Sequence, residues 1–305
     1  MIVHDATPRI SVLMITYKQE KVIGRTLDSL ISQREYLYEI CINDDCSPDG
    51  TWGIIQEYAQ RYPELIKPVK NEKNVGIFEN IELTWERPTG DIVYQLAGDD
   101  EAGNGYFKAV LDYIEENRID YKNELFCIYG DYKEVESDGR EIIFKNSMVL
   151  RHDVMKLKLR MLISNRSACF SRRVIEMFEK VSEGRSYNAE LVQDNQLQLF
   201  VNKNYYIPVV GNIYYAGIGV SARMSREDHI ANINEGYQRL VCFMKSHGHP
   251  FNRKDIAYIE FWKSYRSGKK LAMLKWYVKS IDLSLGLKGL NIERIIFVIK
   301  KRMFK

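Results

Sequence analysis

A regular alternation of strand-like and helix-like stretches over the first 130 residues constrains this chain more than any other feature. Ile10–Thr16 is a continuous apolar run of strand length, and residues 21–33 then carry apolar side chains at a helical period. The same alternation predicts strands at 38–42, 65–69, 91–97 and 125–129, and helices at 51–62, 77–86 and 106–117. Such alternation is typical of βαβ units. We therefore expect an α/β fold with a doubly wound, mainly parallel sheet flanked by helices.

The later part of the chain follows a different pattern. Residues 132–144 indicate a hairpin that turns at Asp138-Gly139, and from about residue 226 the chain reads as helical. Residues 255–305 contain 12 Lys and Arg against 4 Asp and Glu, a net charge of +8, whereas the whole chain carries only +3. We therefore expect two domains, at 1–222 and 223–305, the second being a helical and basic C-terminal extension.

The composition excludes two broad classes of protein. With 45% hydrophobic and 28% charged residues, the chain has enough apolar surface to form a core, so it is not intrinsically disordered. No stretch reaches about 18 consecutive apolar residues, and the N-terminus lacks a leader pattern. These features predict a cytoplasmic protein without a membrane-spanning helix. No nucleic-acid motif is present, so no nucleic-acid partner is expected.

Two pairs of acidic residues follow expected strands. Asp44-Asp45 come directly after the second strand, and Asp99-Asp100 come after the fourth. The carboxyl ends of parallel strands meet at one edge of a sheet, where α/β folds bind ligands. Adjacent carboxylates repel one another unless a cation or hydrogen-bond donors compensate, and Mg²⁺ or Mn²⁺ bound to phosphates commonly does so. The alternative is that both pairs are only turn and cap residues. Two pairs at one edge favour the ligand site.

Four segments in a fixed order carry a family resemblance. They are residues 10–18 (ISVLMITYK), 42–51 (INDDCSPDGT), 74–80 (NVGIFEN) and 89–100 (TGDIVYQLAGDD). Together they resemble the first 120 residues or so of family 2 glycosyltransferases, and weaker similarity continues to about residue 222. The resemblance implies a GT-A catalytic domain at 1–222 that transfers a sugar from a nucleotide-diphosphate sugar, with UDP favoured.

The resemblance also implies roles for individual residues. By position, Asp45 would accept an N–H of the base, Asp99 would face the ribose, and Asp100 would bind Mn²⁺ or Mg²⁺ on the diphosphate. The other residues carried over to the nucleotide-sugar site, beside the base or in its loop, are Thr16, Tyr17, Asn74 and Gly76.

Some residues depart from the family pattern or resist interpretation. Lys18 stands where the family commonly has Asn, and residues 101–105 replace a stretch that often holds an apolar residue and Pro. Arg166, Arg172 and Arg173 flank an expected strand on the acceptor side of the family fold. A charged surface explains these three arginines at least as well.

An inverting transfer needs a carboxylate that takes the proton of the acceptor hydroxyl. The family places this base in an acidic pair at the start of a helix after the metal motif. Residues 193–197 (QDNQL) match that place, so Asp194 is the candidate base and Glu190 is its nearest rival. The alternative is that Asp194 only caps or decorates the helix.

These features predict an inverting, metal-dependent hexosyltransferase. The expected acceptor is a hydroxyl of a glycan or lipid-linked glycan, in bacterial surface polysaccharide or lipopolysaccharide biosynthesis. A nucleotide-sugar-binding protein without catalysis remains an alternative. A nucleotidyltransferase is disfavoured because no glycine-rich loop follows the first strand; the first glycine there is Gly24.

The basic C-terminal segment has two open interpretations. Its aromatic and apolar residues fall at helical spacings between lysines and arginines, and residues 295–299 form a short apolar run before three basic residues. The aromatic and apolar residues at helical spacing are Phe261, Trp262, Tyr265, Leu271, Leu274, Trp276 and Tyr277. The segment either docks peripherally on the anionic inner face of the cell membrane or packs on protein, in the same chain or in a homo-oligomer.

Overall fold

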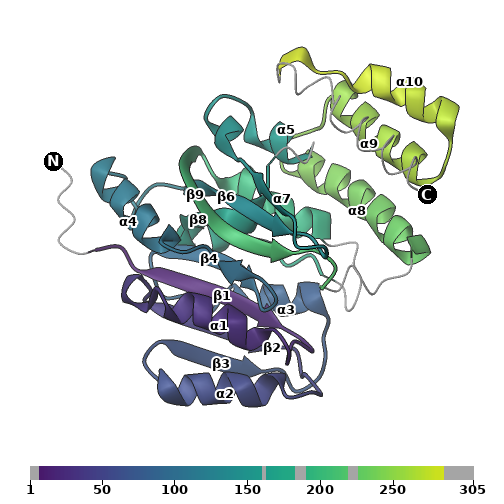
Figure 1. The fold of residues 1–305 in the computed structure, drawn as a ribbon. Coiled ribbons are helices and arrows are strands. Elements are labelled where there is room, and N and C mark those ends of the chain that lie inside the picture. The colour runs from purple at the N-terminus through teal and green to yellow at the C-terminus, as the bar shows by residue number, and fades with distance from the viewer. Residues whose placement is uncertain (1–6, 160–162, 183–189, 219–225, 285–305) are drawn as a thin grey trace. The chain divides into compact units, whose positions relative to one another are not determined.

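The computed structural model describes residues 7–159, 163–182, 190–218 and 226–284 of the 305-residue chain (Figure 1). The chain divides into two compact units, residues 1–232 and 233–305. The division falls inside helix α8 (Arg226–Ser246), whereas the boundary expected from the sequence, 222/223, lies outside the described residues. Each unit has its own group of packed apolar side chains.

In its described residues, the first unit is built on one sheet of nine strands. The strand order is β3-β2-β1-β4-β8-β6-β9-β5, and β7 pairs with β6. The strands are β1 (Ile10–Thr16), β2 (Glu39–Asp44), β3 (Ile66–Lys70), β4 (Ile92–Ala97), β5 (Glu101–Ala102), β6 (Phe126–Val135), β7 (Glu141–Phe144), β8 (Ala168–Ser171) and β9 (Lys203–Tyr215).

The two halves of this sheet differ in strand direction. In the first half, β3, β2, β1 and β4 run parallel. The strands β1 and β2 are buried along almost their whole length, as expected for apolar runs covered on both faces. In the second half, β8 runs antiparallel between β4 and β6, and β6 forms the predicted hairpin with β7. The predicted α/β class is confirmed, with a parallel first half and a mixed second half.

Helices cover the sheet in the order that the apolar spacing predicts. Buried Ile23, Leu27 and Leu30 recur along one face of α1, which therefore packs inward. The helices of this unit are α1 (Ile23–Ile31), α2 (Thr51–Arg61), α3 (Ile77–Thr84), α4 (Tyr106–Glu116), α5 (Val154–Leu159), α6 (Arg172–Ile175) and α7 (Glu190–Phe200). Short 3-10 turns add η1 (Arg34–Tyr36), η2 (Ser147–Leu150) and η3 (Asn165–Ser167).

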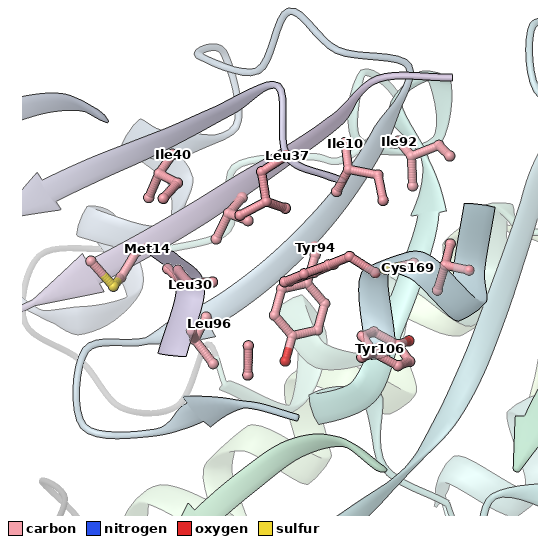
Figure 2. Close-up of a cluster of buried hydrophobic side chains, with 14 of the residues drawn as sticks. Ile10, Met14, Leu30, Leu37, Ile40, Ile92, Tyr94, Leu96, Tyr106 and Cys169 are labelled. Atoms are coloured by element: carbon pink, nitrogen blue, oxygen red, sulfur yellow. The ribbon is translucent and has the colours of Figure 1, made fainter. Parts of the chain in front are cut away.

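Buried tyrosines link the two halves of the sheet. The ring of Tyr94 on β4 packs 5.7 Å from that of Tyr106 on α4 and 5.2 Å from that of Phe107, centroid to centroid (Figure 2). The hydroxyl of Tyr94 donates to the carbonyl of Gly211 at 2.8 Å, and that of Tyr106 donates to the carbonyl of Ser167 at 2.7 Å. These hydrogen bonds of buried hydroxyls tie β9 to β4 through Tyr94 and η3 to α4 through Tyr106.

The second unit contains the helices α9 (Arg253–Arg266) and α10 (Lys270–Ser280), together with most of α8. Asn252 and Asp255 form a capping box that starts α9. The five aromatic residues named from the sequence pack together here with Tyr258: Tyr258, Phe261 and Trp262 are buried, and Tyr265, Trp276 and Tyr277 pack against them partly buried. In the described part of the chain, no helix combines the length and hydropathy needed to cross a bilayer. Residues 295–299 lie outside the described residues.

Candidate functional site

The acidic residues predicted from the sequence gather where β1, β2 and β4 end. In the register of the sheet Thr16 lies beside Asp44, and the amide of Asp45 donates to the carbonyl of Thr16 at 2.9 Å. Asp45 follows β2, and Asp99-Asp100 follow β4, on the other side of β1. Neighbouring strands lie about 5 Å apart, so the axes of β2 and β4 are separated by about 10 Å. The carboxylates therefore share one edge but form two separate groups.

The first group is centred on Asp45, which is buried. Its Oδ1 accepts from the amide of Val75 at 2.8 Å and from Asn71 Nδ2 at 3.0 Å. Its Oδ2 accepts from the amide of Gly76 at 2.9 Å and from Asn74 Nδ2 at 2.8 Å. A carboxylate has about four lone-pair sites, so the loop before α3 satisfies it fully. Three predicted residues, Asp45, Asn74 and Gly76, are thus in direct contact.

Its neighbour Asp44 has a different role. The carboxylate of Asp44 is fully buried and accepts from the amide of Ser47 at 2.8 Å and from Ser47 Oγ at 2.5 Å. Burial raises the pKa of Asp44 above its usual range, while the bonds from Ser47 oppose this. Asp44 therefore closes the turn after β2.

The end of β1 carries the next two predicted residues, Thr16 and Tyr17. Thr16 Oγ1 is buried and has no hydrogen-bond partner within the described residues, which leaves a polar atom for a ligand beside Asp45. Lys18 follows with φ of 55°, and its Nζ lies 5.2 Å from the centroid of the Tyr17 ring. Among non-glycine residues, Asn adopts a positive φ most readily, so this backbone conformation suits Asn better than Lys18.

The second group is centred on Asp100, which is also buried. Its Oδ2 forms an ion pair with Arg166 at 3.2 Å and accepts from Asn212 Nδ2 at 3.4 Å. Burial raises the pKa of Asp100 to about 7; Arg166 opposes the shift and Asp99 adds to it. The neighbouring Asp99 is half-buried, and its carbonyl accepts from Arg25 at 2.9 Å.

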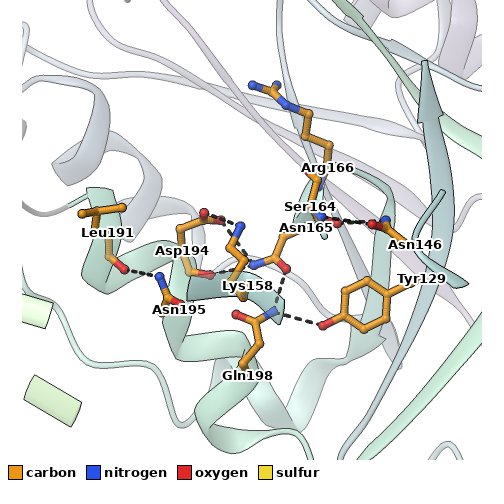
Figure 3. A network of polar contacts seen from close by, with 10 residues as sticks. All are labelled: Tyr129, Asn146, Lys158, Ser164, Asn165, Arg166, Leu191, Asp194, Asn195 and Gln198. Atoms are coloured by element: carbon orange, nitrogen blue, oxygen red, sulfur yellow. Dashed lines mark hydrogen bonds and ion pairs between the residues drawn. The ribbon is translucent and has the colours of Figure 1, made fainter. Parts of the chain in front are cut away.

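The predicted base, Asp194, lies on α7 (Figure 3). It is the fifth residue of the helix as described, one turn after Glu190, whereas the sequence suggested the very start of a helix. Its side chain is 44% exposed and pairs through Oδ2 with Lys158 Nζ. Asn165 Nδ2 donates to Oδ1 of Asp194 at 3.2 Å and to its carbonyl at 2.6 Å. Asp194 is therefore accessible and held from two sides.

Comparison with known families identifies this arrangement. Residues 11–176, more than half of the chain, match the family model described as Glycosyl transferase family 2. The chain belongs to glycosyl transferase family 2. The matched region includes β1, β2 and β4, and with them the Asp45 group and the Asp100–Arg166 pair of this transferase, whereas Asn212 lies beyond it.

Individual proteins are similar over different lengths. Curated mycobacterial proteins are 38% identical over 91 residues, which make up 30% of this chain and only 26% of those proteins. The GalNAc(5)-diNAcBac-PP-undecaprenol beta-1,3-glucosyltransferase of Campylobacter jejuni is 23% identical over 318 residues, covering 98% of this chain and 96% of that enzyme.

Two solved structures show the same fold. S. aureus TarS 1-349 in complex with UDP-GlcNAc has a TM-score of 0.58 at 18% identity, covering 94% of this chain and 91% of that one. Mannosyltransferase PcManGT from Pyrobaculum calidifontis, in complex with GDP-Man and Mn²⁺, has a TM-score of 0.58 at 14% identity, covering 98% and 84%. These similarities confirm the predicted GT-A fold of the transferase.

The Asp100 group suits a divalent cation that is shared with a diphosphate. The described residues contain no cluster of three or more His, Cys, Asp or Glu side chains that could enclose a metal alone. Mg²⁺-type sites commonly use one or two carboxylates and complete their shell with water and phosphate oxygens. Asp99 and Asp100 supply two carboxylates, and Asn212 Oδ1 is a buried amide oxygen with no hydrogen-bond partner among the described residues. These oxygens fit a hard cation.

Two residues of the transferase were not recognised from the sequence. Arg166 was expected either on the acceptor side or at a charged surface; in the structure it pairs with buried Asp100 and stacks 3.9 Å from the ring centroid of Tyr214. Glu82 on α3 is buried and accepts from the amides of Val181 at 2.7 Å and Ser182 at 2.8 Å, and from Gln193 Nε2 at 2.6 Å. Glu82 therefore anchors α7 next to Asp194. Neither pairing leaves a local sequence signal.

The turn η3 connects Asp194 with the Asp100 group. Its first residue, Asn165, bonds Asp194, and the next, Arg166, bonds Asp100. Figure 3 shows that the two side chains leave η3 in different directions. Gln198 Nε2 donates to Asn165 Oδ1 at 2.6 Å and to the Tyr129 hydroxyl at 3.0 Å, which fixes Asn165 from behind.

Proposed function

We propose that the chain is an inverting, metal-dependent transferase that moves a hexose from a nucleoside diphosphate, UDP by preference, to a hydroxyl acceptor. The observation that carries this proposal is the connection through η3. Adjacent residues of one short turn contact Asp100, the proposed metal ligand, and Asp194, the proposed base. Donor and acceptor chemistry would then be held at a fixed separation, as an in-line displacement requires.

The donor nucleotide is proposed to bind across the end of β1. Asp45 fixes the loop that carries Asn74 and Gly76, and an N–H of the base would bind this carboxylate by displacing one of its loop donors. Thr16 Oγ1, buried without a partner among the described residues, is available to the nucleotide beside Tyr17. Asp99 would face the ribose, as its place beside the metal ligand suggests.

The diphosphate is proposed to bind next to Asp100 together with Mn²⁺ or Mg²⁺. When bound, the cation would neutralise the charge that develops on the departing nucleoside diphosphate. The protein would hold it with the carboxylate of Asp100 and the amide oxygen of Asn212, while water and phosphate oxygens would supply the other ligands. Desolvation of Asp100 favours this role, because a buried carboxylate is stabilised by a nearby cation.

Asp194 is proposed to act as the general base. The acceptor hydroxyl would give its proton to the carboxylate of Asp194 while its oxygen forms a bond to the anomeric carbon. The bond from that carbon to the diphosphate oxygen breaks on the opposite face. The exposed side of Asp194 leaves room for the acceptor, and Lys158 and Asn165 hold the carboxylate in position.

The setting is proposed to be surface polysaccharide assembly in bacteria, with a lipid-linked glycan as acceptor. The Campylobacter relative is named for an undecaprenol-linked substrate. On α10, Leu271, Leu274 and Val278 are 87%, 60% and 60% exposed. They recur at helical spacing among exposed lysines: Lys269, Lys270, Lys275 and Lys279. An aliphatic row among lysines suits peripheral docking on an anionic membrane surface, and a second copy of the chain is the competing occupant.

Transfer assays with a panel of UDP-, dTDP- and GDP-sugars, with and without Mn²⁺, test the proposed activity. Asp194→Asn should keep donor binding and lower turnover by about 10²-fold or more, because it removes the base. Asp112→Asn, which changes a similarly exposed carboxylate paired with Lys108, is the matched control and should stay active. Donor binding without transfer or hydrolysis, in wild type and both variants alike, would instead indicate a nucleotide-sugar-binding protein.

Membrane docking has its own test. Full-length protein should co-sediment with anionic vesicles at low salt and less with neutral ones, and Leu271→Ser with Leu274→Ser should weaken this binding. Leu150→Ser, which changes an exposed leucine in the first unit, is the control. Equal sedimentation of both variants would contradict docking by α10, and concentration-dependent dimers lost only in the α10 variant would assign the row to a second copy.

A further inference from the structure

The charge balance around Asp100 is the starting point. Asp100 is buried, and burial of a carboxylate is costly unless a cation or hydrogen-bond donors accompany it. In this transferase the nearest cation is Arg166, 3.2 Å from Oδ2, and Asn212 Nδ2 lies 3.4 Å from the same oxygen. The metal ligand proposed above is therefore already paired with a protein cation.

The Arg166 side chain is placed to move. It is 41% exposed, whereas the Asp100 side chain is only 5% exposed. Its guanidinium is held by the Asp100 ion pair and by the face of Tyr214, 3.9 Å from the ring centroid. An aromatic face holds a guanidinium without fixing one hydrogen-bond geometry. The guanidinium can therefore turn from Asp100 toward a ligand while it remains on Tyr214.

A divalent cation and Arg166 compete for Asp100. With a metal on this carboxylate, three positive charges would lie around one buried group, and the guanidinium would be repelled. A diphosphate offers the guanidinium another partner, because arginine binds phosphate oxygens with paired, charge-assisted hydrogen bonds. Binding of the donor thus draws the Arg166 guanidinium away from Asp100. The same diphosphate supplies the remaining ligands of the metal.

We propose that Arg166 is a latch, which holds Asp100 in the absence of donor and passes to the diphosphate when a nucleotide sugar binds, freeing Asp100 for the metal. This inference rests on the proposed role of Asp100 as metal ligand. With such a latch, metal binding and nucleotide binding are cooperative. Part of the coupling comes from the movement of Arg166 and part from direct contact between the metal and the phosphates. Cooperativity of this kind commonly amounts to about 5- to 150-fold in affinity.

Calorimetric titration with Mn²⁺ alone tests the latch without reference to activity or to the base of the donor. Arg166→Met removes the competitor, so the variant should bind Mn²⁺ about 10-fold more tightly than wild type in the absence of nucleotide. It should also bind UDP without metal about 10-fold more weakly, since the guanidinium no longer reaches the diphosphate. Arg172→Met, which breaks a surface pair with Glu176 at similar exposure, should change neither value.

The outcomes separate the latch from the metal assignment. Unchanged or weaker Mn²⁺ binding by Arg166→Met overturns the latch, provided that Asp100→Asn abolishes Mn²⁺ binding. If Asp100→Asn binds Mn²⁺ as wild type does, the metal assignment fails, and the latch fails with it. Arg166→Lys keeps the charge and guards against a folding defect in the methionine variant. It should bind Mn²⁺ alone as weakly as wild type, and tight binding by the lysine variant would also contradict the latch.

Discussion

The ends of β2 and β4 carry buried carboxylates that are stabilised in opposite ways. Asp45 accepts four hydrogen bonds from uncharged donors of one nearby loop, residues 71–76. Asp100 accepts from one amide and is paired with an arginine 66 residues away. The hydrogen-bonding sites of the first carboxylate are filled without a ligand, whereas the second accepts fewer hydrogen bonds and is stabilised by the cationic side chain of Arg166. The comparison indicates that Asp45 holds the loop in place, whereas the contacts of Asp100 change when a ligand binds.

The sharpest test of this difference is metal-dependent nucleotide binding. Asp100→Asn should lower the affinity for UDP in the presence of Mn²⁺ by about 100-fold or more. Even outer partners of a metal ligand commonly contribute about 10- to 100-fold. Asp45→Asn should weaken UDP binding with and without Mn²⁺ by the same factor, because it acts on the loop and base rather than on the metal. A calorimetric titration with each variant measures both effects. A loss for Asp45→Asn that appears only with Mn²⁺ would reverse the two assignments.

The order of the two variants should reverse for folding stability: Asp45→Asn should lower it more than Asp100→Asn. Asp45→Asn places an amide N–H₂ against N–H donors, so we expect the free energy of unfolding to fall by about 2–4 kcal/mol. Urea unfolding at neutral pH measures this change, and Asp112→Asn is the surface control. In the metal-free protein Asp100→Asn should cost less than about 1 kcal/mol, since it removes a desolvated charge. A larger loss for Asp100→Asn than for Asp45→Asn would contradict the comparison.

The pH dependence of stability isolates the desolvation of Asp100. In the metal-free protein its pKa is raised from 3.8 to about 7. Between these values the folded chain binds a proton that the unfolded chain has lost, so its stabilising contribution is full below the unfolded pKa and is lost as pH rises toward 7. The loss should amount to roughly 2–4 kcal/mol. Urea unfolding of wild type and Asp100→Asn at about pH 5 and about pH 8 gives the difference, because the other titrating groups are shared. Parallel pH profiles would show that Asp100 is not desolvated.

The same contrast explains how far the sequence could predict the molecule. The parallel strands and the acidic pairs were predictable because apolar runs, helical spacing and Asp-Asp at strand ends are local signals. Only the family resemblance singled out Asp45; local sequence signals do not distinguish it from Asp44, since their roles depend on Ser47 and on a loop 26 to 31 residues away. Arg166 and Glu82 act across 66 and about 100 residues, distances at which a single sequence carries no periodic signal. The antiparallel insertion of β8 is non-local in the same way.

The C-terminal helices show the same limit. Helical spacing predicted that the aromatic residues of α9 and α10 share faces, but spacing alone could not say which face is covered. In the structure Phe261 and Trp262 are buried together with Tyr265, Trp276 and Tyr277, while Leu271 and Leu274 are exposed. The candidate docking surface therefore consists of aliphatic and lysine side chains rather than of the aromatic residues.

The smallest expected effect lies at the end of β1, between the two carboxylates. Lys18 adopts φ of 55°, a conformation that Asn tolerates better than other non-glycine residues. Lys18→Asn relieves this strain but loses the contact between the ammonium of exposed Lys18 and the half-buried Tyr17 ring, whose centroid is 5.2 Å away. Lys18→Ala loses the same contact without relieving the strain, so it is the matched control. We expect the asparagine variant to be more stable than the alanine variant by about 0.5–1 kcal/mol in urea unfolding.

Since Lys18 N donates to Ser47 Oγ at 3.1 Å, and Ser47 bonds Asp44 rather than Asp100, this change should leave Mn²⁺ binding untouched. Equal stability of the two variants would mean that the turn is not left-handed at this position. A change in Mn²⁺ affinity would mean that the ends of β1 and β4 are coupled. Asp45 and Asp100 could then not be treated as two independent groups.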